Sequence, residues 1–119
     1  LLFVVLSVRT LLLRRTLGIA IGDAGNESML RAMRVHGNFA EYVPLSLLLM
    51  YLVEVTGASP LYVHALGFAV IAGRVSHAIG VSRLKENYAF RIVGITLTLA
   101  PLVAASLRLL RVFLAQNVA

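Results

Sequence analysis

Five polar residues recur at helical spacing beside one of the most apolar parts of this sequence, and together they could hold a small charged molecule. At about 100° per residue they fall within an arc of roughly 100°, which is one face of one helix. Charged side chains at membrane depth are costly, so they normally face a partner helix or a wet cavity and mark a working site. This polar stripe consists of Arg31, Arg34, Asn38, Glu41 and Tyr42.

The polar stripe offers cationic donors for carboxylates, an amide for a peptide backbone and a carboxylate for an ammonium group. This combination suits a small zwitterionic peptide better than a lipid tail. In an alternative interpretation, Arg34 and Glu41 only neutralise each other or a neighbouring helix. That interpretation explains the tolerated charge, but it does not explain Asn38 or Arg31 on the same stripe.

Three further residues could contribute to such a site. Arg74 and His77 are spaced by three, so they face the same side of a helix. His77 is either a ligand contact or a hydrogen-bonded interior histidine. Arg91 stands at the start of the last apolar segment, where a cation is slightly unfavourable with the helix dipole. In a low-dielectric pocket its guanidinium would stabilise a thiolate and lower the thiol pKa; the alternative role is an interfacial anchor.

The cysteine and histidine content restricts the chemistry. The chain has no cysteine, so a thiol used in catalysis must come from a ligand. Its three histidines, His36, His64 and His77, fall on different helix faces and form no zinc motif. His36 points away from the polar stripe, which indicates a structural or interfacial role. We expect no metal site.

The composition is that of an integral membrane protein. Of the 119 residues, 60% are hydrophobic and only 13% are charged, which is too apolar for an ordinary soluble domain. A net charge of +6 in a soluble protein would suggest nucleic acid. Here the arginines flank apolar segments, as the positive-inside bias predicts, and no aromatic-rich basic surface is present to stack bases. We therefore expect no nucleic-acid partner.

Four apolar segments can be distinguished, and they lack the alternation of barrel strands. Because only helices and closed barrels satisfy the backbone in lipid, we predict an all-α transmembrane four-helix bundle in a single domain, 1–119. Ser59 and Pro60 are typical of a helix start. The expected helices span about 1–15, 27–55, 60–81 and 89–114.

The basic residues predict an orientation. The middle connection, 54–62, holds no Lys or Arg, so it should face outside together with both termini, and the first and third connections should be cytoplasmic. Arg108 and Arg111 near the far end weaken this prediction without reversing it. The basic residues of the first and third connections are Arg14, Arg15, Arg31, Arg34, Arg83, Lys85 and Arg91.

Residues 31–44, RAMRVHGNFAEYVP, resemble the helix-two signature of MAPEG proteins, the membrane-associated proteins in eicosanoid and glutathione metabolism. The segments GDAG at 22–25, RVHGN at 34–38 and AGRVSH at 72–77 are more similar to the bacterial inner-membrane branch of that family. The resemblance covers essentially the whole chain. It implies a multi-pass protein of the bacterial inner membrane that assembles as a homotrimer.

The resemblance also implies that glutathione is held between neighbouring subunits near the cytoplasmic side. Arg91 is similar to the arginine that activates the glutathione thiol, and Arg14 to a helix-one arginine that reaches the peptide. Arg34, Asn38 and Glu41 match glutathione contacts, and Tyr42 and His77 match contacts in part of the family. With Arg31 and Arg74 from the same faces, the expected glutathione-binding set is Arg14, Arg31, Arg34, Asn38, Glu41, Tyr42, Arg74 and His77.

The sequence departs from the family pattern in helix three. Tyrosines that other members carry there are absent, Val81 and Leu84 occupy that region, and Tyr88 is out of register.

We expect a glutathione-dependent transferase or peroxidase whose lipophilic electrophile or hydroperoxide enters from the bilayer. One alternative is a non-catalytic membrane protein that binds glutathione or a lipid. Another is a structural subunit whose polar stripe only locks helices together.

Overall fold

The structure is a computed structural model that describes residues 1–82 and 87–117, and it contains four helices in these ranges. The predicted all-α fold with four helices is confirmed. Arg83, Leu84 and Lys85, which entered the predictions above, lie outside the described residues. The helices are α1 (Leu2–Leu17), α2 (Glu27–Val55), α3 (Pro60–Ser82) and α4 (Tyr88–Asn117).

Local sequence determines where these helices begin and end. The Asn26 side chain accepts a hydrogen bond from the Met29 N–H at 3.0 Å and caps the start of α2. Ser59 accepts one from the Tyr62 N–H at 3.4 Å at the start of α3. Gly18 ends α1 in the left-handed region, at φ 66°, which glycine adopts without steric cost. These ends leave short connections, which place successive helices antiparallel.

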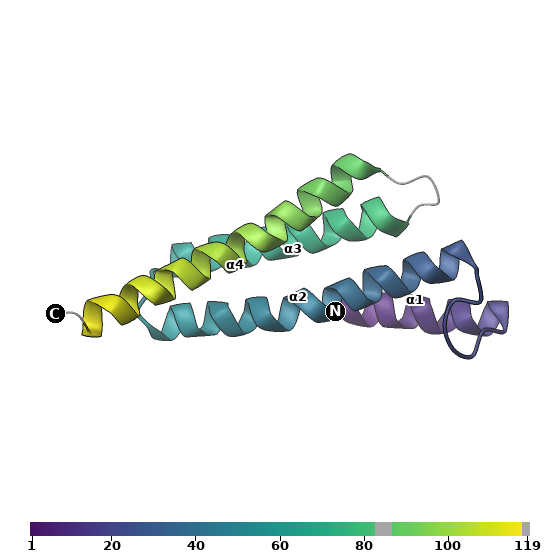
Figure 1. The fold of residues 1–119 in the computed structure, drawn as a ribbon, viewed down its shortest axis with the longest axis horizontal. Helices are drawn as coiled ribbons and strands as arrows, with labels where there is room; N and C mark the ends of the chain where they lie inside the picture. Colours follow the sequence, from purple (N-terminus) through teal and green to yellow (C-terminus); the bar gives the residue numbers. More distant parts are fainter. Residues whose placement is uncertain (83–86, 118–119) are drawn as a thin grey trace.

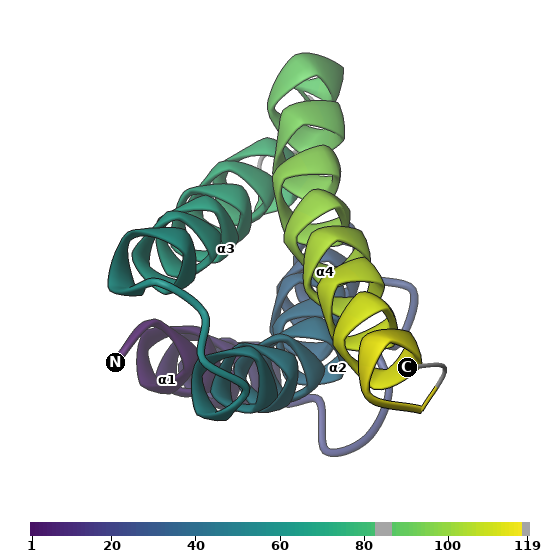
Figure 2. The ribbon, with the colours of Figure 1, turned by 90° about the vertical axis from the view of Figure 1, so that its left-hand side faces the viewer.

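The bundle is elongated and wedge-shaped, with principal extents of 61 × 27 × 22 Å. Figure 1 shows α3 and α4 running together above α2, close to it near the α2–α3 turn and further from it toward the opposite end. α1 lies beside only the first half of α2. The end-on view in Figure 2 separates the α1–α2 pair from α3 and α4.

Two small apolar clusters hold the helices together. Val53, Leu66 and Ala105 join α2, α3 and α4 at the narrow end, whereas Leu6, Val35 and Val81 join α1, α2 and α3 at the wide end. Removing apolar side chains from water stabilises such clusters. Many other apolar side chains lie outside the two clusters and stay exposed. The outward side chains of Phe68 and Ile71 are 76% and 65% exposed, as expected for a surface that contacts lipid.

Three of the described helices, α2, α3 and α4, are long and apolar enough to cross a membrane. α1, with 16 residues, is not among them. The 29 residues of α2 give a length of about 44 Å at 1.5 Å per residue, more than the ~30 Å hydrocarbon core of a bilayer. In a membrane, part of α2 therefore extends beyond the hydrocarbon core.

Glycines bring the backbones of α3 and α4 into contact. A Cβ added at Gly94 would lie 2.5 Å from the His77 backbone nitrogen, and one at Gly80 would lie 2.7 Å from that of Arg91. Small residues permit such close approach between membrane helices. This glycine seam, formed by Gly73, Gly80 and Gly94, fixes His77 and Arg91 on adjacent helices.

Polar contacts attach α1 to its neighbours. Arg9 donates to the Ser82 hydroxyl at 2.6 Å and so links α1 to α3. His36 lies 3.0 Å from the Ser7 hydroxyl through Nε2, and its ring stacks on Phe3 with centroids 4.8 Å apart. His36 thus packs against α1 rather than facing the wedge.

Candidate functional site

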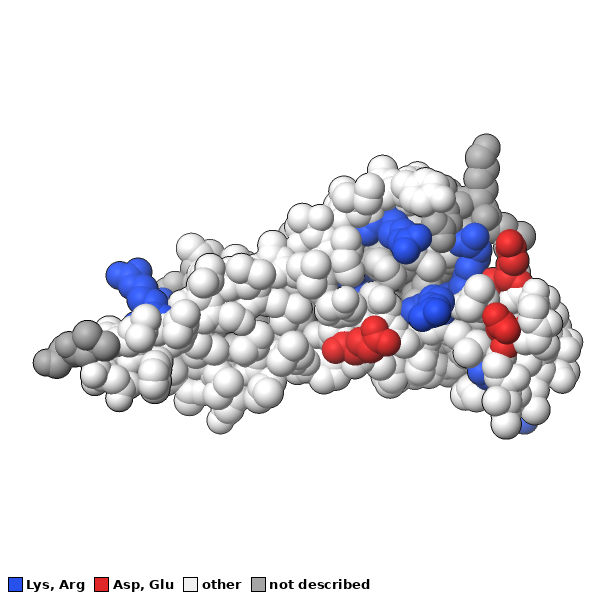
Figure 3. Space-filling view, in the orientation of Figure 1, with Lys and Arg blue, Asp and Glu red and all other residues white. Residues whose placement is uncertain are grey.

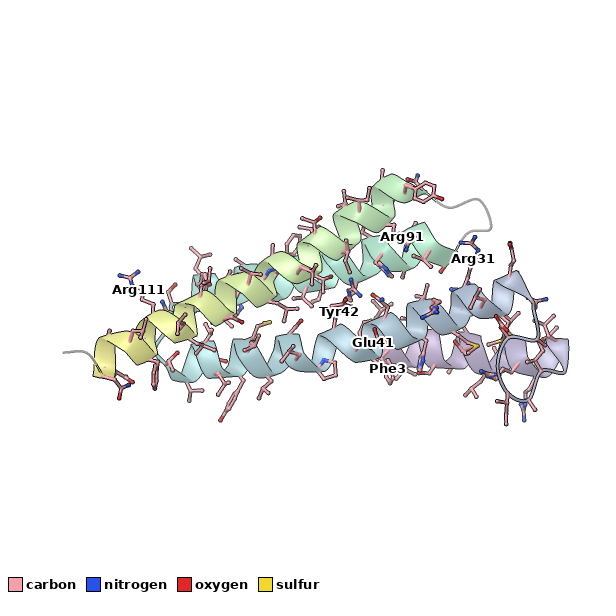
Figure 4. The ribbon with its side chains drawn as sticks, viewed as in Figure 1. Phe3, Arg31, Glu41, Tyr42, Arg91 and Arg111 are labelled. Carbon is pink, nitrogen blue, oxygen red and sulfur yellow. The ribbon has the colours of Figure 1, made fainter. Side chains whose placement is uncertain are left out.

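A cavity of about 460 Å³ opens in the wide part of the wedge. It brings together side chains from α2, α3 and α4 that are far apart in sequence. Figure 3 shows basic side chains gathered around this half of the molecule, and in Figure 4 Arg31 and Arg91 face the space between α2 and the α3–α4 pair. The residues that line this candidate pocket are Glu27, Leu30, Arg31, Arg34, Asn38, His77, Val81 and Arg91.

Helical spacing on α2 builds one wall of the candidate pocket. Arg31, Arg34 and Asn38 follow at intervals of three and four, so all three reach the same cavity. Arg31 also donates to the Val81 carbonyl of α3 at 3.4 Å, across the wedge. Of the described residues that line the cavity, three are arginines and one, Glu27, is a carboxylate, and this balance favours an anionic ligand.

α3 and α4 build the opposite wall. His77 is buried and lines the cavity, while Arg91 is exposed at its edge in the first turn of α4. The glycine seam holds their backbones close together. Val81, one turn after His77, presents an apolar side chain to the cavity. The candidate pocket therefore places an imidazole and a guanidinium together on a wall that includes an apolar surface.

Behind the cavity, Arg74 lies in a buried hydrogen-bond network and is only 3% exposed. Its Nε donates to the Thr98 hydroxyl at 2.9 Å, and its Nη1 donates to Asn38 Oδ1 at 2.9 Å. A longer bond of 3.4 Å runs from Nη2 to the Gly94 carbonyl. Because Arg74 occupies the amide oxygen of Asn38, the amide N–H groups are left to donate elsewhere.

Tyr42 supports this network from α2. The Arg74 guanidinium lies 5.4 Å from the centroid of the Tyr42 ring, within the range of a cation–π contact. Neither residue lines the cavity. In one copy of the chain, Arg74 and Tyr42 therefore support Asn38 from behind.

Like Arg74 and Tyr42, two further predicted site residues lie outside the candidate pocket of a single copy. Arg14 donates through Nη1 to the carbonyls of Ile19, Ala20 and Gly22, at 3.5, 3.3 and 3.0 Å. It thus holds the α1–α2 connection. Glu41 is exposed on α2 (Figure 4) and does not line the cavity. Whether either residue contacts glutathione stays a prediction that involves a second subunit.

Sequence reasoning missed several residues of this region. Glu27 and Leu30 line the cavity although they precede the polar stripe. Each lies four residues before an arginine of the stripe, Arg31 or Arg34, and this spacing indicates the same helix face. Thr98 is fully buried and bonds both to Arg74 and to the Gly94 carbonyl. A lone threonine in an apolar helix gives no comparable signal. In the described part of the chain, no three His, Asp or Glu side chains are grouped as metal ligands would be.

The fold and the site together define a multi-pass α-helical membrane protein with a cationic pocket between its helices. The MAPEG family model matches residues 1–111. The chain belongs to the MAPEG family, which confirms the resemblance read from its helix-two motif.

The chain is also similar to the inner membrane protein YecN of Escherichia coli, from strain K12 and from strain O6:H1. The identity is 40% over 68 residues in each case, which covers 57% of this chain and 52% of the relative. The chain thus spans about half the length of the curated relatives it matches. No solved structure matches it.

Proposed function

We propose that this chain is a membrane-embedded, glutathione-dependent transferase or peroxidase that acts on lipophilic electrophiles or hydroperoxides. The observation that carries the proposal is the candidate pocket, where three arginines meet Asn38 and His77. Its volume of about 460 Å³ lies within the range of small-molecule sites. Glutathione carries carboxylates, an amine, peptide groups and a thiol, and the pocket offers a partner for each of them.

In the proposed complex, Arg31 and Arg34 bind the carboxylates of glutathione through charge-assisted hydrogen bonds. The Asn38 amide, held by Arg74, donates an N–H to a peptide carbonyl. Glu27 lies at the same cavity and accepts a hydrogen bond from the ammonium group. These contacts would direct the thiol toward the wall formed by His77 and Arg91.

Arg91 would stabilise the thiolate because a nearby cation favours the charged form of a thiol. In transfer, the thiolate sulfur bonds to an electrophilic carbon and the leaving group departs with its electron pair. In peroxide reduction, the sulfur attacks the outer oxygen, the O–O bond breaks and the alcohol leaves with a proton. The resulting sulfenic acid is then reduced by a second glutathione, giving the disulfide and water.

The proposal includes a homotrimer in the bacterial inner membrane, with termini outside the cytoplasm. The similarity to an inner membrane protein supports the location. Arg14 and Glu41 lie outside the cavity of one copy, so they would reach glutathione only across a subunit interface. Cross-linking of the purified protein in nanodiscs tests this part, and a monomer there would contradict it.

The enzymatic proposal is tested by comparing wild type with Arg91→Gln and with Arg15→Gln, which removes an exposed arginine on α1. We expect turnover of an aryl halide or cumene hydroperoxide with glutathione to fall about a hundredfold in Arg91→Gln, as for loss of one electrostatic donor. Ultraviolet difference spectra should show less bound thiolate in that variant. Arg15→Gln should match wild type. An inert wild type, or equal rates in wild type and Arg91→Gln, would overturn the proposal.

A second function is a membrane protein that binds glutathione or a lipid without catalysis. The apolar side chain of Val81 favours it, because Val81 lines the cavity in the region where other members of the family carry tyrosines. Titration calorimetry separates the two functions. Glutathione binding that is lost in Arg34→Gln, together with no turnover of either substrate, would support the binding protein.

A further inference from the structure

A second pair of arginines lies far from the candidate pocket, on the last part of α4. Arg108 and Arg111 are spaced by three, so their side chains are neighbours on one helix face. Figure 4 shows Arg111 near the C-terminal end of the bundle, whereas Arg31 and Arg91 lie toward the opposite end. The surrounding residues of α4 are apolar, including Leu107, Leu109, Leu110, Val112, Phe113 and Leu114.

The two arginines share an open cavity of about 520 Å³ with Tyr62 of α3, and none of the described residues that line it is acidic. The Arg108 guanidinium lies 5.6 Å from the centroid of the Tyr62 ring. Within the described part of the chain, neither Arg108 nor Arg111 forms a hydrogen bond or an ion pair. Two adjacent cations thus face one cavity without a negative partner among the described residues.

Arg108 Nε lacks a hydrogen-bond acceptor among the described residues. The atom is shielded from solvent and makes no hydrogen bond among the described residues. A buried donor without an acceptor is unfavourable, and a second cation one turn away adds repulsion. An anion bound between the guanidinium groups would accept a hydrogen bond from Arg108 Nε and reduce the repulsion between the two cations. The planar fork of arginine matches the oxygens of a phosphate.

The position of the pair favours a lipid over a free anion. Leu107 and Leu110 are 61% and 53% exposed beside the arginines, so the helix offers acyl chains an apolar surface that continues from the cationic one. Tyr62 adds an aromatic side chain of the kind enriched at membrane interfaces. Cationic residues near a membrane surface attract anionic headgroups.

We propose that Arg108 and Arg111 bind the phosphate group of an anionic phospholipid at the end of α4 remote from the candidate pocket. The arginines hold the headgroup, and the apolar face of α4 contacts the acyl chains. This proposal is independent of the enzymatic function, because none of its residues lines the candidate pocket.

The test uses the purified full chain in nanodiscs of phosphatidylcholine with a minor share of phosphatidylglycerol. Native mass spectrometry counts the lipids retained by wild type, by the double variant Arg108→Gln/Arg111→Gln and by Arg15→Gln. We expect wild type and Arg15→Gln to retain phosphatidylglycerol above its share, and the double variant to lose this preference by about tenfold. If the double variant does not fold by circular dichroism, Arg111→Gln carries the test, since its exposed side chain makes no bond among the described residues.

Three outcomes would overturn the proposal. The first is equal phosphatidylglycerol retention in wild type and in the folded arginine variant. The second is protection of detergent-solubilised protein from thermal unfolding by inorganic phosphate alone, to the same degree as by phosphatidylglycerol, which would indicate a free-anion site. The third is loss of oligomers in both the arginine variant and Glu54→Gln, which would mean that the arginines pair with the exposed Glu54 of a second copy.

Discussion

Arg74 shows how this protein accommodates a cation among apolar helices. Its partners are the neutral oxygens of Thr98, Asn38 and Gly94 and the ring of Tyr42. A buried charge is tolerated only when hydrogen bonds replace its lost hydration. Because these partners lie on α2 and α4 while Arg74 lies on α3, one side chain connects three helices.

Replacing Arg74 by lysine should destabilise the fold, because an ammonium group cannot reach all of these acceptors at once. We expect Arg74→Lys to lower the free energy of unfolding by about 2 kcal/mol, and Thr98→Val, which removes one neutral partner, by about 1 kcal/mol. Thermal unfolding in detergent, followed by circular dichroism, measures both. A fully stable Arg74→Lys that only loses glutathione affinity would show instead that Arg74 contacts the ligand directly.

Residue types and spacing predicted part of the candidate site. The shared face of Arg31, Arg34 and Asn38 follows from helical periodicity, and these side chains do line one cavity. The sequence also marked Arg74, but it could not show that its guanidinium points at Asn38 instead of into the cavity. That orientation depends on how α3 is rotated about its axis against α2, which periodicity within one helix does not specify.

At the scale of elements, the glycine seam determines how α3 and α4 meet. Without a side chain at Gly94, the α3 backbone approaches closely enough that an added Cβ would lie 2.5 Å from the His77 nitrogen. The nearest atoms are the backbone N and Cα of His77 and its Cβ, so they cannot move aside as the far end of a flexible side chain would.

The substitution Gly94→Ala should therefore separate α3 from α4 and displace His77 relative to Arg91. We expect it to cost about 1–3 kcal/mol of stability, typical of overpacking, and to weaken glutathione binding. Gly37→Ala is the matched control, since a Cβ there meets nothing within 4 Å. That change should stabilise α2 by about 0.5–1 kcal/mol. Equal melting temperatures for the two variants would contradict the role of the seam.

The elements themselves were more predictable than their arrangement. Apolar runs and the Ser59–Pro60 signal indicated four helices, and α3 begins at Pro60. The wedge was not predictable, because α3 pairs with α4 through close contact at the glycines, and this pair joins α2 through clusters such as Val53, Leu66 and Ala105. These contacts join residues that are distant in sequence.

At the scale of the whole molecule, charge is distributed unevenly along the long axis. Most basic side chains gather at the wide end of the wedge, and a separate basic group lies near the C-terminal end (Figure 3). The positive-inside bias therefore predicts that the wide end faces the cytoplasm. Composition and the helix-two motif were enough to predict the all-α class and the family. The oligomeric state was not predictable in the same way, because the sequence of one chain does not show which surfaces of two copies meet.

The absence of cysteine makes this orientation directly measurable. Ile21 and Leu61 are 91% and 79% exposed at opposite ends of the bundle, so single cysteines there should be accessible without disturbing the core. We expect a membrane-impermeant maleimide to label Leu61→Cys in intact spheroplasts, and Ile21→Cys only after lysis. The reverse pattern would show that the arginines of the wide end lie outside.

The cluster of Val53, Leu66 and Ala105 at the narrow end has a consequence for the barrier that surrounds this protein. A water-filled polar cavity that crossed the whole membrane would let protons and ions leak between the two compartments. Among the described residues, these apolar side chains close the bundle at its narrow end, whereas the cavity opens at its wide end. A membrane that contained such a bundle would keep its proton gradient, because the apolar cluster separates the cavity from the opposite end.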